Sequence, residues 1–246
     1  MHDVQGLIAV VTGGAQGIGA GVAKVLAKQG AKVALLDNRP DALEQTRRQM
    51  TQSGWQVAAQ VCDVTVKEQV AAAFAVVAGK WGGADVLVNN AGAIRDAAFL
   101  KMQEKDWDDI IDVNLRSQFL CCQAAIPYML EKGFGRIVNI SSRAMKGSRG
   151  QANYAAAKGG VISLTKSLAI EFAGKGITAN AVCPGLIDTP MFHGMPETIK
   201  EKLIKTIPVG RVGQPEEIGR AVAFFAGKDA GYITGQFFFV CGGRSL

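Results

Sequence analysis

The chain has 246 residues, 48% of them hydrophobic, and this length and composition suit one α/β domain with a complete core. Its net charge of +6 comes from basic residues dispersed among acids, so we expect no binding of nucleic acid. At the N-terminus no basic segment precedes a long apolar run, and no run of about 18 apolar residues occurs, so we expect neither a signal peptide nor a membrane span. The five cysteines are scattered without a CxxC pair, which indicates a reduced cytoplasmic protein and no metal site.

Short apolar runs alternate along the chain with segments of helical spacing. Strands are predicted at 7–11, 32–37, 56–63, 85–90, 135–141, 178–185 and 237–240. Helices are predicted at 17–29, 41–53, 67–80, 106–130, 152–174 and 215–226. This alternation predicts an α/β fold, a doubly wound parallel sheet of about seven strands with helices on both faces, in a single domain spanning 1–246. Such sheets bind ligands beyond the carboxyl ends of their strands.

A glycine-rich loop, TGGAQGIG at 12–19, follows the first predicted strand and opens the first predicted helix. Its residues Gly13, Gly17 and Gly19 permit positive φ and close approach of the backbone, and the helix N-terminus attracts phosphate. Asp37 ends the second strand, which is the context that a dinucleotide site requires. The alternative is an ordinary tight turn between a strand and a helix.

The same region bears on the choice of nucleotide. Asp37 is placed to accept hydrogen bonds from the adenosine ribose hydroxyls and would repel a 2′-phosphate. Gln16 brings no charge to the loop, so NAD(H) is favoured. Arg39 lies two residues beyond Asp37 and leaves NADP(H) as the second option.

Tyr154 and Lys158 stand four residues apart in the sequence NYAAAK, so on a helix both side chains leave the same face. A neighbouring ammonium stabilises a phenolate and lowers the tyrosine pKa from its usual value of about 10. A tyrosine treated in this way can act as an acid or base near neutral pH. The alternative is a surface pair without a function.

Other segments complete a set of motifs. Ser141 ends the strand of GRIVNISS, NNAG occupies 89–92, and Asn114 lies in DVNLRS. With TGGAQGIG and NYAAAK, these segments resemble the single-domain type of the short-chain dehydrogenase/reductase family, over essentially the whole chain. Within that family, NNAGAIRD, GQANYAAAKGG and IPVGRVGQPEEI are most similar to the 3-oxoacyl-ACP and acetoacetyl-CoA reductases.

The resemblance implies catalytic roles. Tyr154 would be the general acid for carbonyl reduction and the base for alcohol oxidation, while Lys158 would lower its pKa and hold the nicotinamide ribose. Ser141 would polarise the substrate carbonyl, and Asn114 would hold a water that relays protons from Lys158. We interpret Ser142 as structural, because side chains alternate along a strand and the 13-residue spacing to Tyr154 fits Ser141.

The resemblance also implies cofactor contacts. Asp63 and Val64 would flank the adenine, with a helix cap as the alternative for Asp63. The Asn90 backbone would lie near the ribose. Ile187 and Thr189 would hold the nicotinamide carboxamide, with a simple loop hydroxyl as the alternative for Thr189. The glycine-loop contacts are assigned to Gly13, Gln16, Gly17, Ile18 and Gly19. One departure is Cys241, where the family often has an acidic or amide residue, which puts the C-terminal subunit contacts in doubt.

The segment 188–208 is predicted to be a lid over the nicotinamide end, with a helix packed on the core as the alternative. The predicted substrate contacts are Ser141, Gln151, Met191 and Phe192. We expect a carbonyl or alcohol substrate with a hydrophobic or flexible chain, such as a thioester of CoA or of acyl carrier protein. Carrier docking would need basic residues near the mouth, although a solvated surface charge is the favoured interpretation of each candidate: Lys132, Arg136, Arg143, Arg149 and Lys175.

Two other functions compete with a carbonyl reductase. One is an NAD-dependent secondary-alcohol, polyol or cyclic-alcohol dehydrogenase that works oxidatively, and the other is a non-catalytic nucleotide-binding regulator. A degenerate regulator should have lost part of the catalytic centre, yet Asn114, Ser141, Tyr154 and Lys158 are all present. The family usually assembles through the two long helices, so we expect a homotetramer joined by 106–130 and 152–174.

Overall fold

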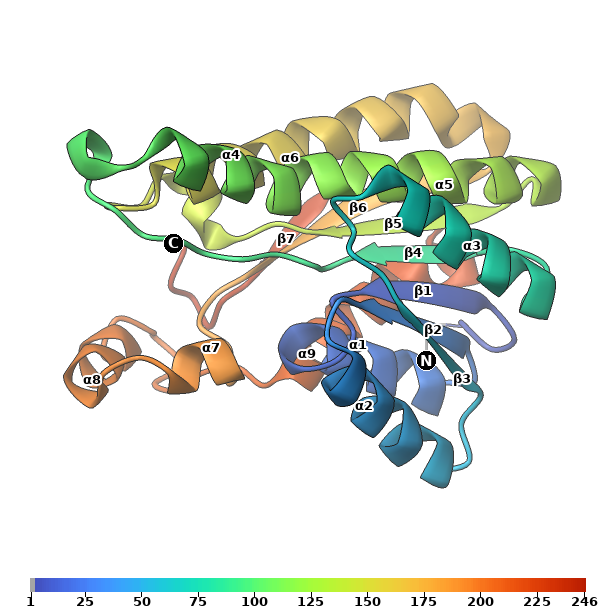
Figure 1. Ribbon diagram of the computed structural model, residues 1–246, viewed down its shortest axis with the longest axis horizontal. Helices are drawn as coiled ribbons and strands as arrows, with labels where there is room; N and C mark the ends of the chain where they lie inside the picture. Colours follow the sequence, from blue (N-terminus) through green and yellow to red (C-terminus); the bar gives the residue numbers. More distant parts are fainter. Residues whose placement is uncertain (1–2) are drawn as a thin grey trace.

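The computed structural model describes residues 3–246 and contains one seven-stranded parallel sheet in the order β3-β2-β1-β4-β5-β6-β7 (Figure 1). The doubly wound α/β prediction is therefore confirmed, because the strand order reverses between β1 and β4. The predicted strands agree with the observed ones to within two residues. The observed bounds are β1 Ile8–Thr12, β2 Lys32–Asp37, β3 Val57–Val61, β4 Val86–Asn89, β5 Gly135–Ile140, β6 Ile177–Pro184 and β7 Phe237–Val240.

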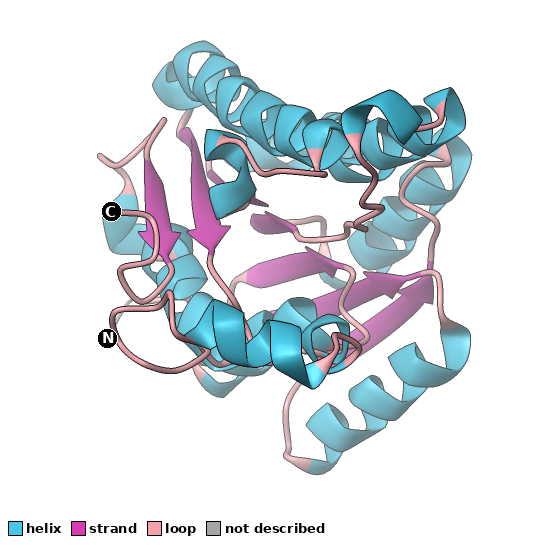
Figure 2. Ribbon diagram, turned by 90° about the vertical axis from the view of Figure 1, so that its left-hand side faces the viewer, coloured by secondary structure: helices cyan, strands magenta, loops and turns pink. Residues whose placement is uncertain are grey.

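Helices cover both faces of the sheet, as the two layers in Figure 2 make plain. One layer comprises α1 (Gly17–Lys28), α2 (Pro40–Gln52) and α9 (Pro215–Ala226), whose apolar side chains form one core cluster with β1 and β2. The other comprises α3 (Lys67–Trp81), α4 (Glu104–Ile111), α5 (Ser117–Lys132) and α6 (Ala152–Phe172). Both faces of the central strands are thus buried, which explains why these strands are apolar without strict alternation.

The predicted helix 106–130 is helical throughout but is not a regular α-helix. A π-helical turn, Asp112–Arg116, separates α4 from α5 and contains the buried Asn114. Such a turn widens the helix locally and is frequent at functional sites. Helical spacing in the sequence does not distinguish a π-helical turn from an α-helical one, so the sequence did not predict the turn at Asp112–Arg116.

The segment between β6 and α9 forms two short helices, α7 (Pro190–His193) and α8 (Glu197–Ile204), which stand apart from both layers (Figure 1). None of the eight residues of α8 is buried. The alternative of a helix packed on the core is therefore wrong for α8. Within residues 3–246, every helix is too short or too polar to cross a membrane.

Candidate active site

A cavity of about 570 Å³ opens beyond the carboxyl ends of the strands. Most of the predicted site residues line it, although they come from segments spread between residues 13 and 192. Four predicted cofactor residues do not: Gly19, Asp37, Asp63 and Val64. The predicted residues in the lining are Gly13, Gln16, Gly17, Ile18, Asn90, Asn114, Ser141, Gln151, Tyr154, Lys158, Ile187, Thr189, Met191 and Phe192.

The glycine loop needs its glycines for both conformation and space. Gly13 and Gly17 have φ values of +62° and +55°, in the left-handed region that side chains disfavour. A Cβ added at Gly19 would collide with the carbonyl oxygen of Gly13. The Asn90 Nδ2 donates to the carbonyl oxygens of Thr12 and Gly13, at 2.9 and 3.1 Å. Asn90 thus holds the loop with its side chain, beyond the backbone role predicted for it.

The N-terminus of α1 faces this loop and suits an anion. Gln16, the residue before the helix, is extended and makes no capping hydrogen bond with its side chain. The first turn of α1 contains no acidic residue. Its first N–H groups have no partner within the helix, and together with the helix dipole they fit the pyrophosphate of a dinucleotide.

Asp37 is 4% exposed, and the protein itself occupies its carboxylate. It accepts hydrogen bonds from the main-chain N–H of Ala15 at 3.0 Å and of Arg39 at 3.1 Å. The Arg39 guanidinium binds both carboxylate oxygens, through Nε at 3.0 Å and Nη2 at 3.1 Å. Arg39, rather than Asp37, lines the cavity. The Asp37 carboxylate is thus already bound by the protein, and its contact with the ribose stays a prediction.

Asp63 and Val64 have structural roles in this protein. The Asp63 Oδ1 accepts hydrogen bonds from the Thr65 N–H at 2.9 Å and the Thr65 hydroxyl at 2.7 Å, in a turn before α3. Val64 belongs to the core cluster beneath α3. Asp63 is not the cap of α3, because Val66 is the residue that precedes the helix, and the adenine contacts of Asp63 and Val64 stay predictions.

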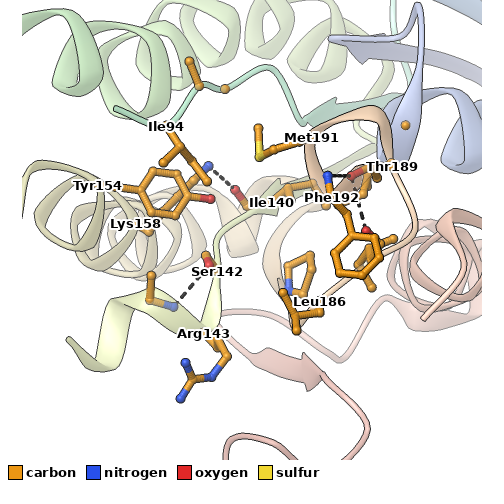
Figure 3. Close-up of a pocket in the computed structure, with 18 of the residues that line it drawn as sticks. Ile94, Ile140, Ser142, Arg143, Tyr154, Lys158, Leu186, Thr189, Met191 and Phe192 are labelled. Carbon is orange, nitrogen blue, oxygen red and sulfur yellow. Dashed lines mark hydrogen bonds between the residues drawn. The ribbon is translucent and has the colours of Figure 1, made fainter. Parts of the chain in front are cut away.

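Tyr154 and Lys158 lie on the face of α6 that forms the cavity wall (Figure 3). The Lys158 Nζ is 5.6 Å from the centroid of the Tyr154 ring and donates to the carbonyl oxygen of Ile140 at 2.9 Å. Lys158 is buried, and the small residues between the pair leave room for both side chains. The structure thus brings the predicted pair together at the end of β5.

The structure corrects the choice between the two serines. Ser141 is 2% exposed, and its hydroxyl donates to the carbonyl oxygen of Lys158 at 2.8 Å. Ser142 instead caps the 3₁₀ turn Arg143–Lys146, where its hydroxyl accepts from the Ala144 N–H at 3.1 Å (Figure 3), and it lies near enough to the Tyr154 side chain to lower the pKa of that group. Because β5 ends at Ile140, strand alternation does not extend to this pair. Both serines line the cavity, but the Ser141 hydroxyl is bonded to the Lys158 main chain, so Ser142 becomes the better candidate for the carbonyl donor.

The two titratable groups respond chiefly to burial. Burial raises the pKa of Tyr154 to about 12, the nearby Ser142 hydroxyl opposes this rise, and the charge of Asp96 adds to it. Burial lowers the pKa of Lys158 to about 8. In the protein alone, burial thus sets the pKa of Tyr154, and Lys158 is not among the groups that lower it. The phenol is protonated at neutral pH, which is the form that donates a proton.

The side chain of Asn114 is fixed by two hydrogen bonds through its amide nitrogen. Its Nδ2 donates to the carbonyl oxygens of Ala93 and Ile110, each at 2.9 Å. Its Oδ1 is buried and has no hydrogen-bond partner within residues 3–246. A Cβ added at Gly92 would lie 2.5 Å from this oxygen and 3.6 Å from the Lys158 Nζ. Gly92 therefore leaves space in which a water can bridge the two groups.

The substrate end of the cavity is built from less regular segments. Thr189 caps α7, since its Oγ1 accepts from the Phe192 N–H at 3.3 Å. Its hydroxyl therefore has a structural role at the start of this helix. Phe192 is 7% exposed and Met191 is 51% exposed, so α7 turns one apolar side chain inward and leaves the other open. Gln151 donates from Nε2 to Asp96 at 3.0 Å.

Three of the predicted docking residues lie at the opposite end of the sheet. Lys132 pairs with Asp85 at 2.6 Å, before β4, and Arg136 is buried at the start of β5. Lys175 lies just before β6. Because all strands are parallel, these positions are at the amino ends, away from the cavity. Only Arg143 and Arg149 of that set line it.

Comparison with known proteins places the chain among enzymes. A family model described as enoyl-(acyl carrier protein) reductase matches residues 13–245. The chain belongs to the short-chain dehydrogenase/reductase family. It is therefore an oxidoreductase that uses a nicotinamide cofactor, and the family resemblance of its motifs is confirmed.

Three curated relatives of this short-chain dehydrogenase/reductase match nearly full length. The (2S)-[(R)-hydroxy(phenyl)methyl]succinyl-CoA dehydrogenase subunit BbsD of Thauera aromatica is 42% identical, over 99% of this chain and 98% of the relative. A 3-oxoacyl-[acyl-carrier-protein] reductase FabG of Thermotoga maritima is 41% identical, over 98% of each chain. An acetoacetyl-CoA reductase of Rhizobium meliloti is 45% identical, over 96% of this chain and 98% of the relative.

A solved structure agrees with the fold and with the type of cofactor. A variant of the actinorhodin polyketide ketoreductase, solved with NADPH, superposes with a TM-score of 0.93. It is 35% identical, and the match covers 98% of this chain and 97% of that one. Among the cavity residues with a polar side chain to which sequence reasoning gave no place in the lining are Arg39, Ser142 and Arg244. Only the SS pair before Arg143 could have signalled one of them.

Proposed function

We propose that this enzyme reduces the ketone of a 3-oxoacyl thioester to the secondary alcohol. The observation that carries the proposal is that Ser142 and Tyr154 line the same cavity, where Ser142 is near enough to Tyr154 to lower its pKa, so that two hydroxyl donors can meet one substrate oxygen. The names of the relatives support it, since two of them are reductases of 3-oxoacyl or acetoacetyl thioesters.

In this proposal Tyr154 is the catalytic acid. A bound nicotinamide nucleotide supplies the hydride, which leaves negative charge on the substrate oxygen. Tyr154 donates its proton to that oxygen, and Ser142 donates a hydrogen bond to it. Two fixed donors stabilise such charge far better than water does, because they need no reorientation. Ser141 takes a positioning role instead, since its hydroxyl ties the end of β5 to the Lys158 main chain.

Lys158 and Asn114 would help to return a proton from solvent to Tyr154 after each turnover. The Lys158 ammonium lies against the Tyr154 ring, where its charge favours the phenolate left after proton donation. Asn114 offers its buried Oδ1 to a water that connects Lys158 with solvent. The π-helical turn serves this role because it aims the side chain of Asn114 at Gly92 and Lys158.

NAD(H) is the proposed nucleotide, with NADP(H) as the weaker partner. The Arg39 charge is already neutralised by two hydrogen bonds to Asp37. A 2′-phosphate would have to displace that carboxylate and would then lie beside it. Ribose hydroxyls are neutral. They can hydrogen-bond to the accessible side of the Asp37–Arg39 ion pair without displacing the carboxylate.

The surroundings of the site extend the proposal. The segment 188–208 acts as a lid, because Ile199 and Leu203 line the cavity from an otherwise exposed helix and Met195 lines it from the turn before that helix. The acyl group arrives as a thioester of CoA or of acyl carrier protein. We infer a cytoplasmic location from the five free cysteines and a homotetramer joined through α5 and α6, where Phe119 and Ile170 are exposed.

A second function is oxidation of a secondary alcohol with NAD as acceptor. The name of the Thauera aromatica relative, a dehydrogenase, favours this direction. Tyr154 would then act as the base, which its pKa of about 12 disfavours in the protein alone. A purely regulatory nucleotide-binding role is disfavoured, because all members of the catalytic centre are in place.

The deciding experiment measures loss of nicotinamide absorbance with acetoacetyl-CoA, in parallel with NADH and with NADPH. We expect rapid oxidation of NADH and slower oxidation of NADPH. Oxidation of NADPH alone would retain the reductase and overturn the preference for NAD(H). If neither is oxidised, the ketoreductase proposal fails, and a panel of secondary alcohols with NAD tests the oxidative function.

A further inference from the structure

Two arginines at the substrate end of the cavity have no part in the reduction described above. Arg143 directly follows Ser142, and Arg244 comes from the C-terminal segment after β7; both line the cavity. The Arg143 Nε is buried and lacks a hydrogen-bond partner within residues 3–246. The Arg244 Nε donates to the hydroxyl of Thr206 at 2.7 Å, which is a neutral partner. Within that same range, neither guanidinium has a carboxylate in ion-pair distance.

The two guanidinium groups repel each other. Burial lowers the pKa of Arg244, and the positive charge of Arg143 lowers it further. A Cys241 thiolate would offset part of this positive charge. Burial raises the pKa of the Cys241 thiol, but hydrogen bonds with Ser245 and with the main chain of Gly243 and Arg244 outweigh burial, so the pKa is lowered. Two like charges held together in a partly buried place are costly unless an anion joins them.

We propose that Arg143 and Arg244 bind a carboxylate of the substrate, so that the preferred acyl group carries a second acid function. The inference rests on the proposed function and names its substrate class. Guanidinium forks match the planar carboxylate with paired hydrogen bonds, which makes arginine the usual residue for this task. The other cavity arginines are less suited, because Arg39 is engaged by Asp37 and Arg149 is exposed.

The position of Arg143 indicates which acid group it meets. Its Cα is one residue, about 3.8 Å, from that of Ser142, whose hydroxyl we assign to the reacting ketone. In Figure 3 the Arg143 side chain extends from this point away from Tyr154. The anion therefore lies a few bonds beyond the ketone, on the acyl group. The phosphates of CoA or of a carrier arm are separated from the ketone by the whole pantetheine chain.

The test compares binding of two saturated thioesters of equal length by calorimetry, with NAD present. One is hexanoyl-CoA, and the other is the monothioester of hexanedioic acid, which differs by a terminal carboxylate. We expect wild-type protein to bind the hexanedioyl thioester about tenfold to a hundredfold more tightly. Arg143→Gln and Arg244→Gln should each bring this ratio close to one. Arg149→Gln, a cavity arginine outside the pair, should leave the ratio unchanged.

Equal binding of the two thioesters by wild-type protein would overturn the inference, as would an unchanged ratio in both variants. Free CoA is titrated as well: if the variants weaken CoA and the hexanedioyl thioester equally, the arginines bind CoA phosphates and the inference is wrong. Circular dichroism checks folding, and Arg244→Gln tests the pair without touching the neighbour of Ser142. Turnover of the matching 3-oxo thioesters tests the proposed function separately, since its failure leaves the binding ratio intact.

Discussion

The two ends of the cavity differ in how completely the protein satisfies its own polar groups. At the nucleotide end, Asp37, Arg39 and Asn90 are all hydrogen-bonded to neighbouring residues. At the substrate end, the Arg143 Nε and the Asn114 Oδ1 are buried without partners in the described part of the chain. The side chains of the nucleotide end are therefore paired within the protein and leave main-chain N–H groups of α1 for the ligand, whereas the substrate end leaves side-chain donors and acceptors for a ligand or water.

The difference follows from the elements that build each end. The nucleotide end uses strand ends and the N-terminus of α1, which the buried core holds in place. The substrate end uses a 3₁₀ turn, the short helices α7 and α8, and the C-terminal segment. Loops on a rigid scaffold vary without disturbing the core, so substrate choice is expected to reside there.

The largest effect is expected where the two ends meet, at Tyr154. Tyr154→Phe removes the proton donor and should lower kcat about 10²-fold to 10⁴-fold or more. Affinity for NADH, measured by fluorescence titration, should change by less than about threefold, because the nucleotide end is intact. Turnover near the wild-type rate would show that another group supplies the proton.

The two neighbouring serines provide a matched pair. Ser142→Ala should lower kcat about 10²-fold to 10³-fold, since it removes one donor to the developing oxyanion. Ser141→Ala should lower kcat by less than about tenfold and cost about 1 kcal/mol of stability, because it loses one buried hydrogen bond. Steady-state kinetics and thermal melts distinguish them. The reverse order of effects would restore Ser141 as the carbonyl donor.

The pH dependence of reduction tests the electrostatics of the centre. A Tyr154 pKa of about 12 keeps the phenol protonated through neutral pH, so the proton donor is present across this range. A Lys158 pKa of about 8 means that its charge is present below pH 8 and lost above it. We expect kcat for reduction to be level at low pH and to fall as pH rises through about 8. A rate that rises through the same interval would contradict this assignment.

The smallest effect is expected at the nucleotide end. Asp37→Ala frees the Arg39 guanidinium and should shift the ratio of kcat/KM for NADPH over NADH upward by about tenfold. Adding Arg39→Gln in the same chain should reverse the gain, since the freed cation is removed. Parallel assays with both nucleotides provide the measurement. An unchanged ratio in Asp37→Ala would remove Asp37 from the discrimination.

Local patterns predicted the framework well. Apolar runs placed all seven strands, because strands buried on both faces are apolar throughout and need only a short window to recognise. The pair Tyr154 and Lys158 was predictable because both belong to one helix, whose geometry is known in advance. Lys132 and Arg136 were assigned to the wrong end of the sheet, since a basic residue carries no local sign of which edge it occupies.

The sequence by itself thus determined the doubly wound sheet, the glycine loop and the catalytic pair, each of which depends on spacing within one element. Only the tertiary structure decided which serine faces Tyr154, because that depends on β5 ending at Ile140 and on a 3₁₀ turn beginning after Ser142. It also decided that Arg39 covers Asp37 and that Arg143 and Arg244, far apart in the chain, share one cavity. These outcomes depend on which hydrogen bonds and ion pairs the folded chain can complete, and residues distant in sequence settle that competition.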